Sequence, residues 1–263
     1  MTEHSAPIAG RRQVWIDEGA GDPPLVLLHG IGSGAASWAP VLPALSARRR
    51  VIAWNLPGYG GADRLPGPHA GPADHADALL GFLDHLGIAQ CDLLGHSLGG
   101  LLAAYVARKP PGRVRRLVLS SPAGGYRVPA GAELPAGLAA RIADVRELGP
   151  VGMAEKRAAN MVGPNTDPAI LERVRATMAA VDTEGYAQAV WLLAQGDVAG
   201  WAPGITVPTL VVVGTADRVT KPEAVGELAA LIPGVSRQLI EGAGHASYAD
   251  HAAEYAATIN KFL

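Results

Sequence analysis

A serine, an aspartate and a histidine follow one another along this chain, each shortly after a predicted strand. Ser97 lies in the segment GHSLGG, Asp217 in VGTADRV and His245 in EGAGH. A serine hydroxyl is a poor nucleophile at neutral pH, so it needs a base within hydrogen-bond reach, and that base needs an acid to orient it. The three residue types therefore predict nucleophilic catalysis, with Ser97 as nucleophile, His245 as general base and Asp217 as orienting acid.

The surroundings of Ser97 are typical of a nucleophile elbow, a sharp turn between a strand and a helix. Residues 91–94 (CDLL) predict the strand, and residues 101–107 (LLAAYVA) predict the helix. The chain contains 33 glycines, so a Gly-x-Ser-x-Gly match alone is weak support, and the flanking elements strengthen it. Gly95 and Gly99 leave room for the turn, and the helix N-terminus favours developing negative charge beside the serine.

The two partner residues also stand where a sheet could bring them to the serine. Asp217 follows the run TLVVV and His245 follows the predicted strand RQLI, and sites of open α/β sheets form at the carboxyl ends of the strands. An acid could instead follow the preceding strand, but residues 120–125 contain no Asp or Glu. Asp250 is a second candidate acid, although it lies beyond the histidine. The order Ser97, Asp217, His245 is the one expected for an elbow of this kind.

A glycine-rich loop, residues 29–34, follows the buried strand LVLL and could turn backbone N–H groups toward the serine. We predict that the N–H groups of Ile31 and Leu98 form the oxyanion hole. Gly32 takes the place of Ile31 if the loop is offset by one residue. The alternative is a plain glycine-rich turn. His29 is interpreted as a structural residue that braces the loop rather than as a proton carrier.

The elements that must position these residues alternate in type. Short apolar strands separated by helices favour an α/β fold with a mostly parallel twisted sheet and helices on both faces. The alternation stops after residues 114–119, and no strand is predicted before residue 209. Four helices are predicted there, over residues 135–148, 151–160, 168–180 and 183–195. We therefore expect a core of residues 1–122 and 205–263, and a helical cap, residues 123–204, inserted after the sixth strand.

The composition limits the kinds of partner and the kinds of site that the chain can be expected to have. The chain has 263 residues, 49% of them hydrophobic, and a formal net charge of −2, so a sizeable core is expected and neither nucleic acid nor an anionic membrane is an expected partner. The basic run 48–50 is interpreted as a solvated helix end. Cys91 is the single cysteine, which excludes an internal disulfide, and we expect it to be buried. The histidines lack metal-ligand spacing, and those of the predicted helix region are expected at the surface: His69, His75 and His85.

No signal peptide or membrane span is predicted from the sequence. Residues 1–12 lack a long apolar core, and no stretch approaches 18 consecutive apolar residues, the order of length that a spanning helix needs, roughly 18–20 residues. We therefore expect a cytoplasmic protein, without a metal or a cofactor. The sequence leaves the oligomeric state open.

A substrate pocket is expected between the cap and the sheet. The candidate apolar lining residues are Met161, Met178, Trp191, Leu192, Leu193 and Trp201. From these we predict Met161 and Trp191 as substrate-binding residues, together with Gly32. The alternative is that most of them pack the cap helices against one another. The cap also carries arginines that could meet an anionic substrate or lie exposed: Arg141, Arg146, Arg157, Arg173 and Arg175.

Taken together, the His-Gly loop, the GHSLGG elbow, Asp217 and His245 resemble the α/β-hydrolase superfamily, over essentially the whole chain. Within it, the chain is similar to the 3-oxoadipate enol-lactonase-like group, on the segments DTEGYA in the cap and VPTL before the acid's strand. This resemblance implies a serine hydrolase that cleaves a carboxylic ester or lactone of small to medium size through an acyl-enzyme, with no cofactor.

Single residues distinguish this chain from enzymes of the same fold that have other activities. Haloalkane dehalogenases and epoxide hydrolases carry aspartate at the elbow, so Ser97 disfavours both. The carbon–carbon hydrolases of aromatic meta-cleavage share a glycine-rich loop like residues 30–34, with Trp38 nearby. They typically have tryptophan directly after the base, where this chain has Ala246. They remain the alternative function. A non-catalytic ligand-binding protein is a further alternative, which usually shows a damaged triad.

Overall fold

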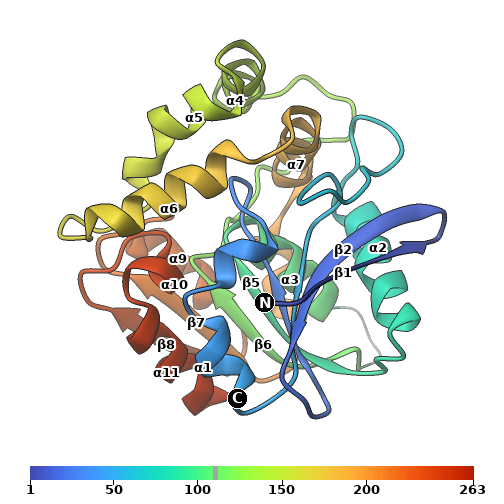
Figure 1. The fold of residues 1–263 in the computed structure, drawn as a ribbon, viewed down its shortest axis with the longest axis vertical. Helices are drawn as coiled ribbons and strands as arrows, with labels where there is room; N and C mark the ends of the chain where they lie inside the picture. Colours follow the sequence, from blue (N-terminus) through green and yellow to red (C-terminus); the bar gives the residue numbers. More distant parts are fainter. Residues whose placement is uncertain (109–111) are drawn as a thin grey trace.

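Eight strands form one twisted sheet in residues 1–108 and 112–263, the part of the chain that this computed structural model describes (Figure 1). In chain order the strands are β1 (Glu3–Ile8), β2 (Arg11–Glu18), β3 (Leu25–Leu28), β4 (Val51–Trp54), β5 (Cys91–His96), β6 (Val114–Ser120), β7 (Thr209–Gly214) and β8 (Ser236–Ile240). Their order across the sheet is β1-β2-β4-β3-β5-β6-β7-β8. The five pairings between neighbouring strands from β4 to β8 are parallel. The pairing of β1 with β2 and that of β2 with β4 are antiparallel. The mostly parallel sheet is thus confirmed.

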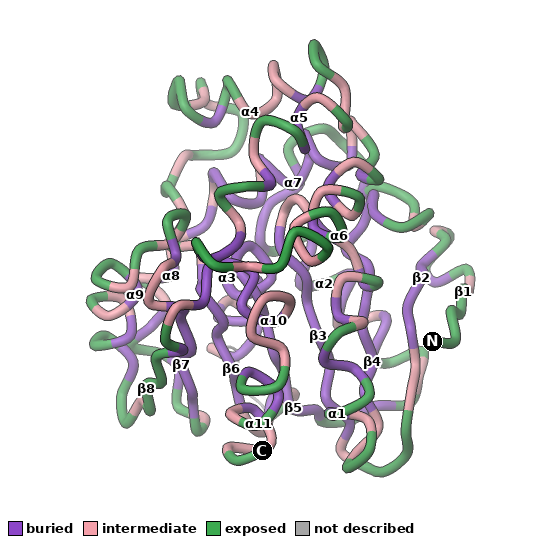
Figure 2. The backbone as a smooth tube through the Cα atoms, turned by 60° about the vertical axis from the view of Figure 1, so that its left-hand side comes forward, coloured by how far each residue is buried: buried purple, intermediate pink, exposed green. Residues whose placement is uncertain are grey.

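Helices cover both faces of the sheet, as predicted. They are α1 (Leu42–Ser46), α2 (Pro72–His85), α3 (Leu98–Ala107), α4 (Ala136–Glu147), α5 (Gly149–Arg157), α6 (Pro168–Ala179), α7 (Thr183–Gln195), α8 (Val198–Trp201), α9 (Pro222–Ala229), α10 (Ser247–Asp250) and α11 (Ala252–Phe262). Alternate residues of each strand face opposite sides. Leu25 and Leu27 pack with α1 and α11, whereas Val26 and Leu28 pack with α2 and α3. The central strands are therefore buried on both faces (Figure 2).

The four helices predicted between β6 and β7 are all present, and their ends differ from the predicted ends by a few residues at most. Helices α4, α5, α6 and α7 lie together beyond one edge of the sheet, at the top of Figure 1. No strand occurs in residues 123–204, all of which the structure describes. That this segment forms a cap over the site remains a prediction.

Helix α7 is joined to the loop after β4 by backbone contact and by one glutamine. Gly185 lies so close to Gly58 that a Cβ on Gly185 would stand 2.2 Å from the Gly58 carbonyl oxygen. The Gln188 side chain donates to the carbonyl oxygens of Leu65 and Gly67, at 3.0 and 2.7 Å, and accepts from the Leu65 N–H at 3.0 Å. These contacts fix α7 to the core.

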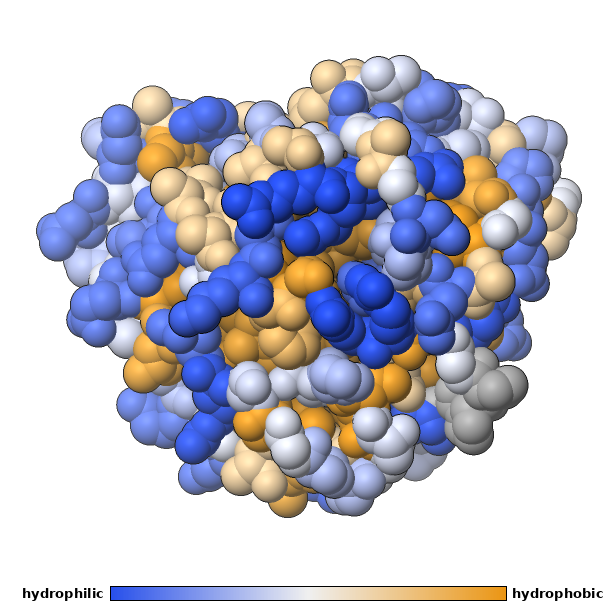
Figure 3. Space-filling model, turned by 90° about the horizontal axis from the view of Figure 1, so that it is seen from below, coloured by the Kyte–Doolittle hydropathy of each residue, from blue (hydrophilic) through white to orange (hydrophobic). Residues whose placement is uncertain are grey.

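The basic run 48–50 lies between α1 and β4, at the end of the sheet away from α4–α7. Arg50 pairs with Asp17 of β2 at 2.6 Å, and Arg48 is exposed. Figure 3 views the molecule from below relative to Figure 1, and strongly hydrophilic groups cross this end.

Cys91 is buried, as expected. Every helix in the described residues is too short or too polar to span a bilayer.

The predicted surface position of His75 is wrong. His69 and His85 are exposed, but His75 is 1% exposed and its Nδ1 lies 2.9 Å from the Gly71 carbonyl oxygen. The reason is helical periodicity: His75 lies on the same stripe of α2 as Leu79 and Phe82, both buried. Burial lowers the His75 pKa to about 4.

We expect His75 to make the protein sensitive to acid. The unfolded chain takes up a proton near the ordinary pKa of 6.5, whereas the folded protein resists it down to a pKa of about 4. Stability contributed by neutral His75 is therefore lost as pH falls through this window, by about 3 kcal/mol. Urea unfolding of wild type and His75→Gln across the window tests this. Buried His29 and His96 titrate in both proteins, so equal slopes against pH would contradict the prediction.

Candidate active site

Four parallel strands of the sheet deliver the predicted residues to the edge where their carboxyl ends lie. Ser97 follows β5, Asp217 follows β7 and His245 follows β8, while the glycine-rich loop of residues 29–34 follows β3. Parallel strands end at the same edge, which explains how residues far apart in sequence meet here. Ser97, His245, Ile31 and Leu98 line one cavity of about 1110 Å³.

Ser97 occupies a backbone conformation that non-glycine residues rarely adopt, with φ 52° and ψ −113°. Such a conformation costs about 1–3 kcal/mol and persists only where the surroundings enforce it. The Ser97 N–H donates to the Ser120 carbonyl at 2.9 Å, and the Ser97 carbonyl accepts from the N–H groups of Ala123 and Leu101. The turn is therefore held from β6 and from α3, as the elbow prediction requires.

The glycines of the elbow are required by close backbone approach. A Cβ on Gly99 would stand 2.2 Å from the Leu28 carbonyl oxygen, and one on Gly95 would stand 2.1 Å from the Gly99 carbonyl oxygen. Both distances are far below contact distance, and the atoms met belong to the backbone. Helix α3 can therefore pack against β3 and β5 only with glycine at these two positions.

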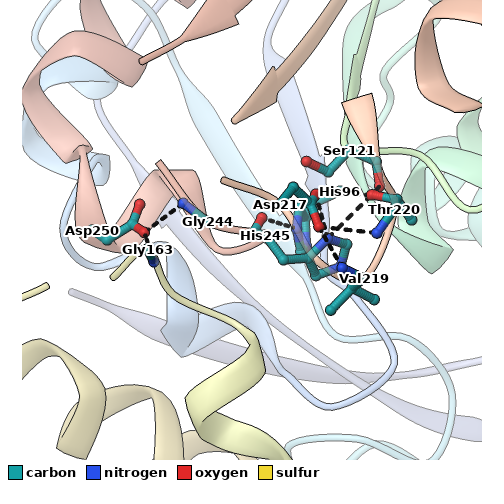
Figure 4. A network of polar contacts seen from close by, with 9 residues as sticks. All are labelled: His96, Ser121, Gly163, Asp217, Val219, Thr220, Gly244, His245 and Asp250. Carbon is teal, nitrogen blue, oxygen red and sulfur yellow. Dashed lines mark hydrogen bonds and ion pairs between the residues drawn. The ribbon is translucent and has the colours of Figure 1, made fainter. Parts of the chain in front are cut away.

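Asp217 and His245 form a buried hydrogen-bonded pair (Figure 4). The His245 Nδ1 lies 2.8 Å from Asp217 Oδ2, and both residues are at most 3% exposed. Because a carboxylate only accepts, Nδ1 carries the proton and Nε2 is left as the basic nitrogen. Asp217 Oδ1 accepts the N–H groups of Val219 and Thr220 at 2.8 and 2.9 Å. Asp217 is thus fixed by its own turn, and its hydrogen bond holds the His245 ring in one orientation.

The charge on Asp217 is stabilised by these hydrogen bonds. Burial by itself raises the pKa of this carboxyl, but the bond and charge of His245 and the backbone N–H groups outweigh it and bring the pKa to about 2. Asp217 is therefore ionised at neutral pH. The other candidate acid, Asp250, accepts from the N–H groups of Gly163 and Gly244 instead, and lies to one side in Figure 4.

Two further residues touch this pair, and sequence reasoning missed both. The Thr220 hydroxyl lies 2.9 Å from Asp217 Oδ2 and 3.2 Å from His245 Nδ1. A hydroxyl residue three positions after an aspartate in a turn is a local signal that could have revealed it. His96 Nε2 donates to the His245 carbonyl at 2.9 Å, across 149 positions of sequence, which no local pattern encodes. Burial, and then His245, lower the His96 pKa to about 3, so the ring is neutral.

The glycine-rich loop is braced through its carbonyl groups. His29 Nε2 accepts the Leu56 N–H at 3.0 Å, so Nδ1 carries the proton and donates to the Gly30 carbonyl at 2.8 Å. The Tyr59 hydroxyl donates to the Ile31 carbonyl at 2.7 Å. Burial lowers the His29 pKa to about 4, which agrees with a structural role. Within the described residues the N–H groups of Ile31 and Leu98 have no acceptor, so both are available to an oxyanion.

The cavity lining includes some of the predicted pocket residues and not others. Gly32 and Met161 line it, and so do Met178 and Leu193. The structure does not bring Trp191 there, because α7 turns this side chain toward the exposed His69, with ring centroids 4.1 Å apart. Leu192 and Trp201 are also absent from the residues that line this cavity. Larger apolar lining residues that were not predicted include Ile170, Val174, Tyr186, Val219, Val225, Leu228 and Tyr248.

Of the five arginines named above as candidates in the predicted cap, three line the cavity, namely Arg141, Arg157 and Arg173. Arg146 and Arg175 instead form ion pairs at the surface, with Glu184 and Glu172. Two cations of the core loop after β7 complete the set of basic lining residues, Arg218 and Lys221. No three His, Cys, Asp or Glu side chains gather as a metal site in the part of the chain that the structure describes.

The sheet, the strained elbow and the paired histidine and aspartate together define the class of this protein. A family model described as the alpha/beta hydrolase fold matches residues 23–252, and the chain belongs to this family. A 2-hydroxymuconate semialdehyde hydrolase of Pseudomonas sp. (strain CF600) is 31% identical over 97% of this chain and 91% of its own length. A pimeloyl-[acyl-carrier protein] methyl ester esterase of Neisseria meningitidis is 31% identical, over 90% of this chain and 91% of its own.

Solved structures give the same family and confirm the resemblance to enol-lactonases. The enol-lactonase from Burkholderia xenovorans LB400 superposes with a TM-score of 0.89 at 27% identity, covering 98% of this chain and 99% of that one. Some curated relatives are matched over part of their length only, and the chain spans 32% of one of them. The relatives thus include a lactonase, an esterase and a semialdehyde hydrolase.

Proposed function

We propose that this protein is a serine hydrolase that cleaves a carboxylic ester or a lactone of small to medium size through an acyl-enzyme. The observation that carries the proposal is the buried His245–Asp217 pair at 2.8 Å, whose histidine lines the same cavity as the strained Ser97. The likeness to an enol-lactonase and to a methyl ester esterase supports the same reaction class. Residues 123–204 then form the cap that closes the cavity over the sheet.

In the first half of the reaction, the Ser97 hydroxyl attacks the carbonyl carbon while His245 Nε2 takes its proton. Asp217 holds the imidazole in the required tautomer and stabilises the imidazolium. The carbonyl oxygen becomes an oxyanion and is bound by the N–H groups of Ile31 and Leu98. Each donor of this kind contributes about 3–4 kcal/mol to the transition state.

In the second half, His245 returns its proton to the alkoxide oxygen as the bond between carbonyl carbon and oxygen breaks. From an ester the alcohol departs, whereas from a lactone the new hydroxyl stays on the acyl chain. His245 then takes a proton from water, the hydroxide attacks the acyl-enzyme, and the acid is released as Ser97 recovers its proton. This cycle needs no electron acceptor or cofactor.

The charge of the cavity lining favours a substrate with a negative group away from the scissile carbonyl. Five basic side chains line the cavity, and no Asp or Glu does so among the described residues. Arg157 pairs with Asp144, but Arg141, Arg173 and Lys221 have no ion-pair partner among the described residues. Uncompensated positive charge in a concave site attracts anions.

The alternative function, hydrolysis of a carbon–carbon bond in a meta-cleavage product, is favoured by one observation. The 2-hydroxymuconate semialdehyde hydrolase matches nearly the whole chain at 31% identity. Against it, Ala246 follows His245. A purely binding role is disfavoured because the site retains all three residue types, with His245 bonded to Asp217 and lining the same cavity as Ser97.

A substrate panel with a covalent probe tests the proposal. We expect a fluorophosphonate to label Ser97, located by mass spectrometry, and we expect turnover of p-nitrophenyl esters or lactones. The panel includes p-nitrophenyl hydrogen adipate and its neutral amide analogue, and the anionic ester should have the higher kcat/KM. Turnover of a meta-cleavage dienoate alone would replace the proposal with the alternative. An unlabelled, inactive but folded protein would reject both enzymes.

A further inference from the structure

Asp250 is a buried carboxylate that the proposed mechanism does not use. It ends the short helix α10, five residues after His245, and its side chain is 0% exposed. Its Oδ2 accepts two backbone N–H groups at 2.8 Å, one from Gly244 and one from Gly163 (Figure 4). Gly244 directly precedes the base in sequence, whereas Gly163 lies in the segment proposed as the cap. One oxygen atom therefore joins the base loop to the cap segment.

The two segments that Asp250 joins lie directly against each other. The Ala246 N–H donates to the Met161 carbonyl at 2.6 Å. A Cβ on Gly244 would stand 2.3 Å from the Val162 carbonyl carbon, and one on Gly163 would stand 2.2 Å from the Gly242 carbonyl oxygen. The backbone on both sides of His245 thus packs directly against the backbone of residues 161–163.

The same part of the cap also contacts the loop of the acid. Arg218, the residue after Asp217, donates from Nη2 to the Ala159 carbonyl at 2.7 Å. Residues 159–163 therefore bridge the loops that carry Asp217 and His245. Asn160 and Met161 within this stretch line the substrate cavity, so the segment that touches the substrate also supports the base.

From these contacts we infer that Asp250 is a positioning residue, which places the His245 imidazole by tying its loop to residues 159–163 of the cap. A carboxylate that accepts two backbone N–H groups makes short, charge-assisted hydrogen bonds. Without it, two buried donors lose their acceptor and the loop of residues 242–246 loses its fixed support. The inference rests on the proposed function, because it assigns His245 the role of base.

The test compares Asp250→Ala, Asp250→Asn and a control, Asp167→Ala. Asp167 is a carboxylate of the proposed cap that, like Asp250, accepts a backbone N–H, here that of Ala169 at 2.8 Å, and the structure places it in neither catalysis nor binding. We expect Asp250→Ala to lower kcat for a p-nitrophenyl ester by about 10- to 100-fold, with little change in KM. Asp250→Asn keeps one acceptor oxygen and should recover part of this loss. Asp167→Ala should keep the wild-type kcat.

A proton spectrum separates positioning from a general loss of structure. The His245 Nδ1 proton, hydrogen-bonded to Asp217, gives a low-field resonance, which should shift or broaden in Asp250→Ala and stay unchanged in Asp167→Ala. An unchanged resonance with kcat within about twofold of wild type would overturn the inference. So would equal losses of kcat in Asp250→Ala and Asp167→Ala. If Asp250→Ala does not fold, Asp250→Asn decides by the same two readouts. A wild type inactive on every ester and every lactone would reject the proposed function instead, and the resonance would still report on Asp250.

Discussion

Replacing Ser97 with alanine is expected to lower kcat for ester hydrolysis by at least about 10⁴-fold, because the nucleophile of the proposed acyl-enzyme is lost. The remaining oxyanion donors and binding contacts leave only a residual rate. Single-turnover and steady-state assays on the best ester of the panel measure this loss. Retention of more than about a tenth of the activity would contradict the nucleophilic role.

A second variant at the same position serves as the matched control for stability. Ser97→Gly also removes the hydroxyl, but glycine adopts the φ of 52° without the strain that alanine keeps. We expect both variants to be inactive. In urea unfolding, the free energy of unfolding of Ser97→Gly should exceed that of Ser97→Ala by about 1 kcal/mol. Equal stabilities would indicate that the elbow stores little strain.

The largest effect on stability is expected from Gly99→Ala. Alanine is the better helix former, and helix propensity alone would make this change favourable by about 0.5–1 kcal/mol. At Gly99, however, the added Cβ would stand 2.2 Å from the Leu28 carbonyl oxygen, so α3 must move away from β3. We expect a loss of more than about 3 kcal/mol in the free energy of unfolding, or no folded protein.

Gly137→Ala in α4 is the control, since nothing lies within 4 Å of the Cβ that it adds. This change is expected to be neutral or to stabilise the protein by up to about 1 kcal/mol. Urea unfolding of the two variants beside wild type gives both values. Gly99→Ala with wild-type stability would mean that the contact between helix and strand can relax, contrary to the backbone geometry.

The central sheet could be predicted from sequence because buried parallel strands leave continuous apolar runs. Leu25–Leu28, predicted as the buried strand LVLL, is buried at every position and has the same ends in the structure. Strand β1 was missed, since the edge strand Glu3–Ile8 is largely exposed and has no apolar run. The apolar residues Val14–Ile16 predict only the middle of β2 (Arg11–Glu18), because its polar ends, which pair with β1 and with β4, carry no apolar signal.

The site was predictable where chain order and local context coincide, and less so where side chains from distant segments meet. Ser97, Asp217 and His245 each follow a recognisable strand, and the structure brings all three to one edge of the sheet. Whether Trp191 faces the cavity depends on the rotation of α7, which the sequence did not reveal. Asp250 was considered only as an alternative acid, because its contact with Gly163 spans 87 positions.

The backbone contact between Gly58 and Gly185 predicts which part of the proposed cap is free to move. Helix α7 meets the core with no side chain between the two backbones, and it is buried along most of its length. Its amide protons should therefore exchange with solvent only when the core itself unfolds. Helix α4 buries just Leu138 and Val145, so its protons should exchange through small local openings. We therefore expect substrate to enter through fluctuations of the outer helices, while the contact between α7 and the core stays closed.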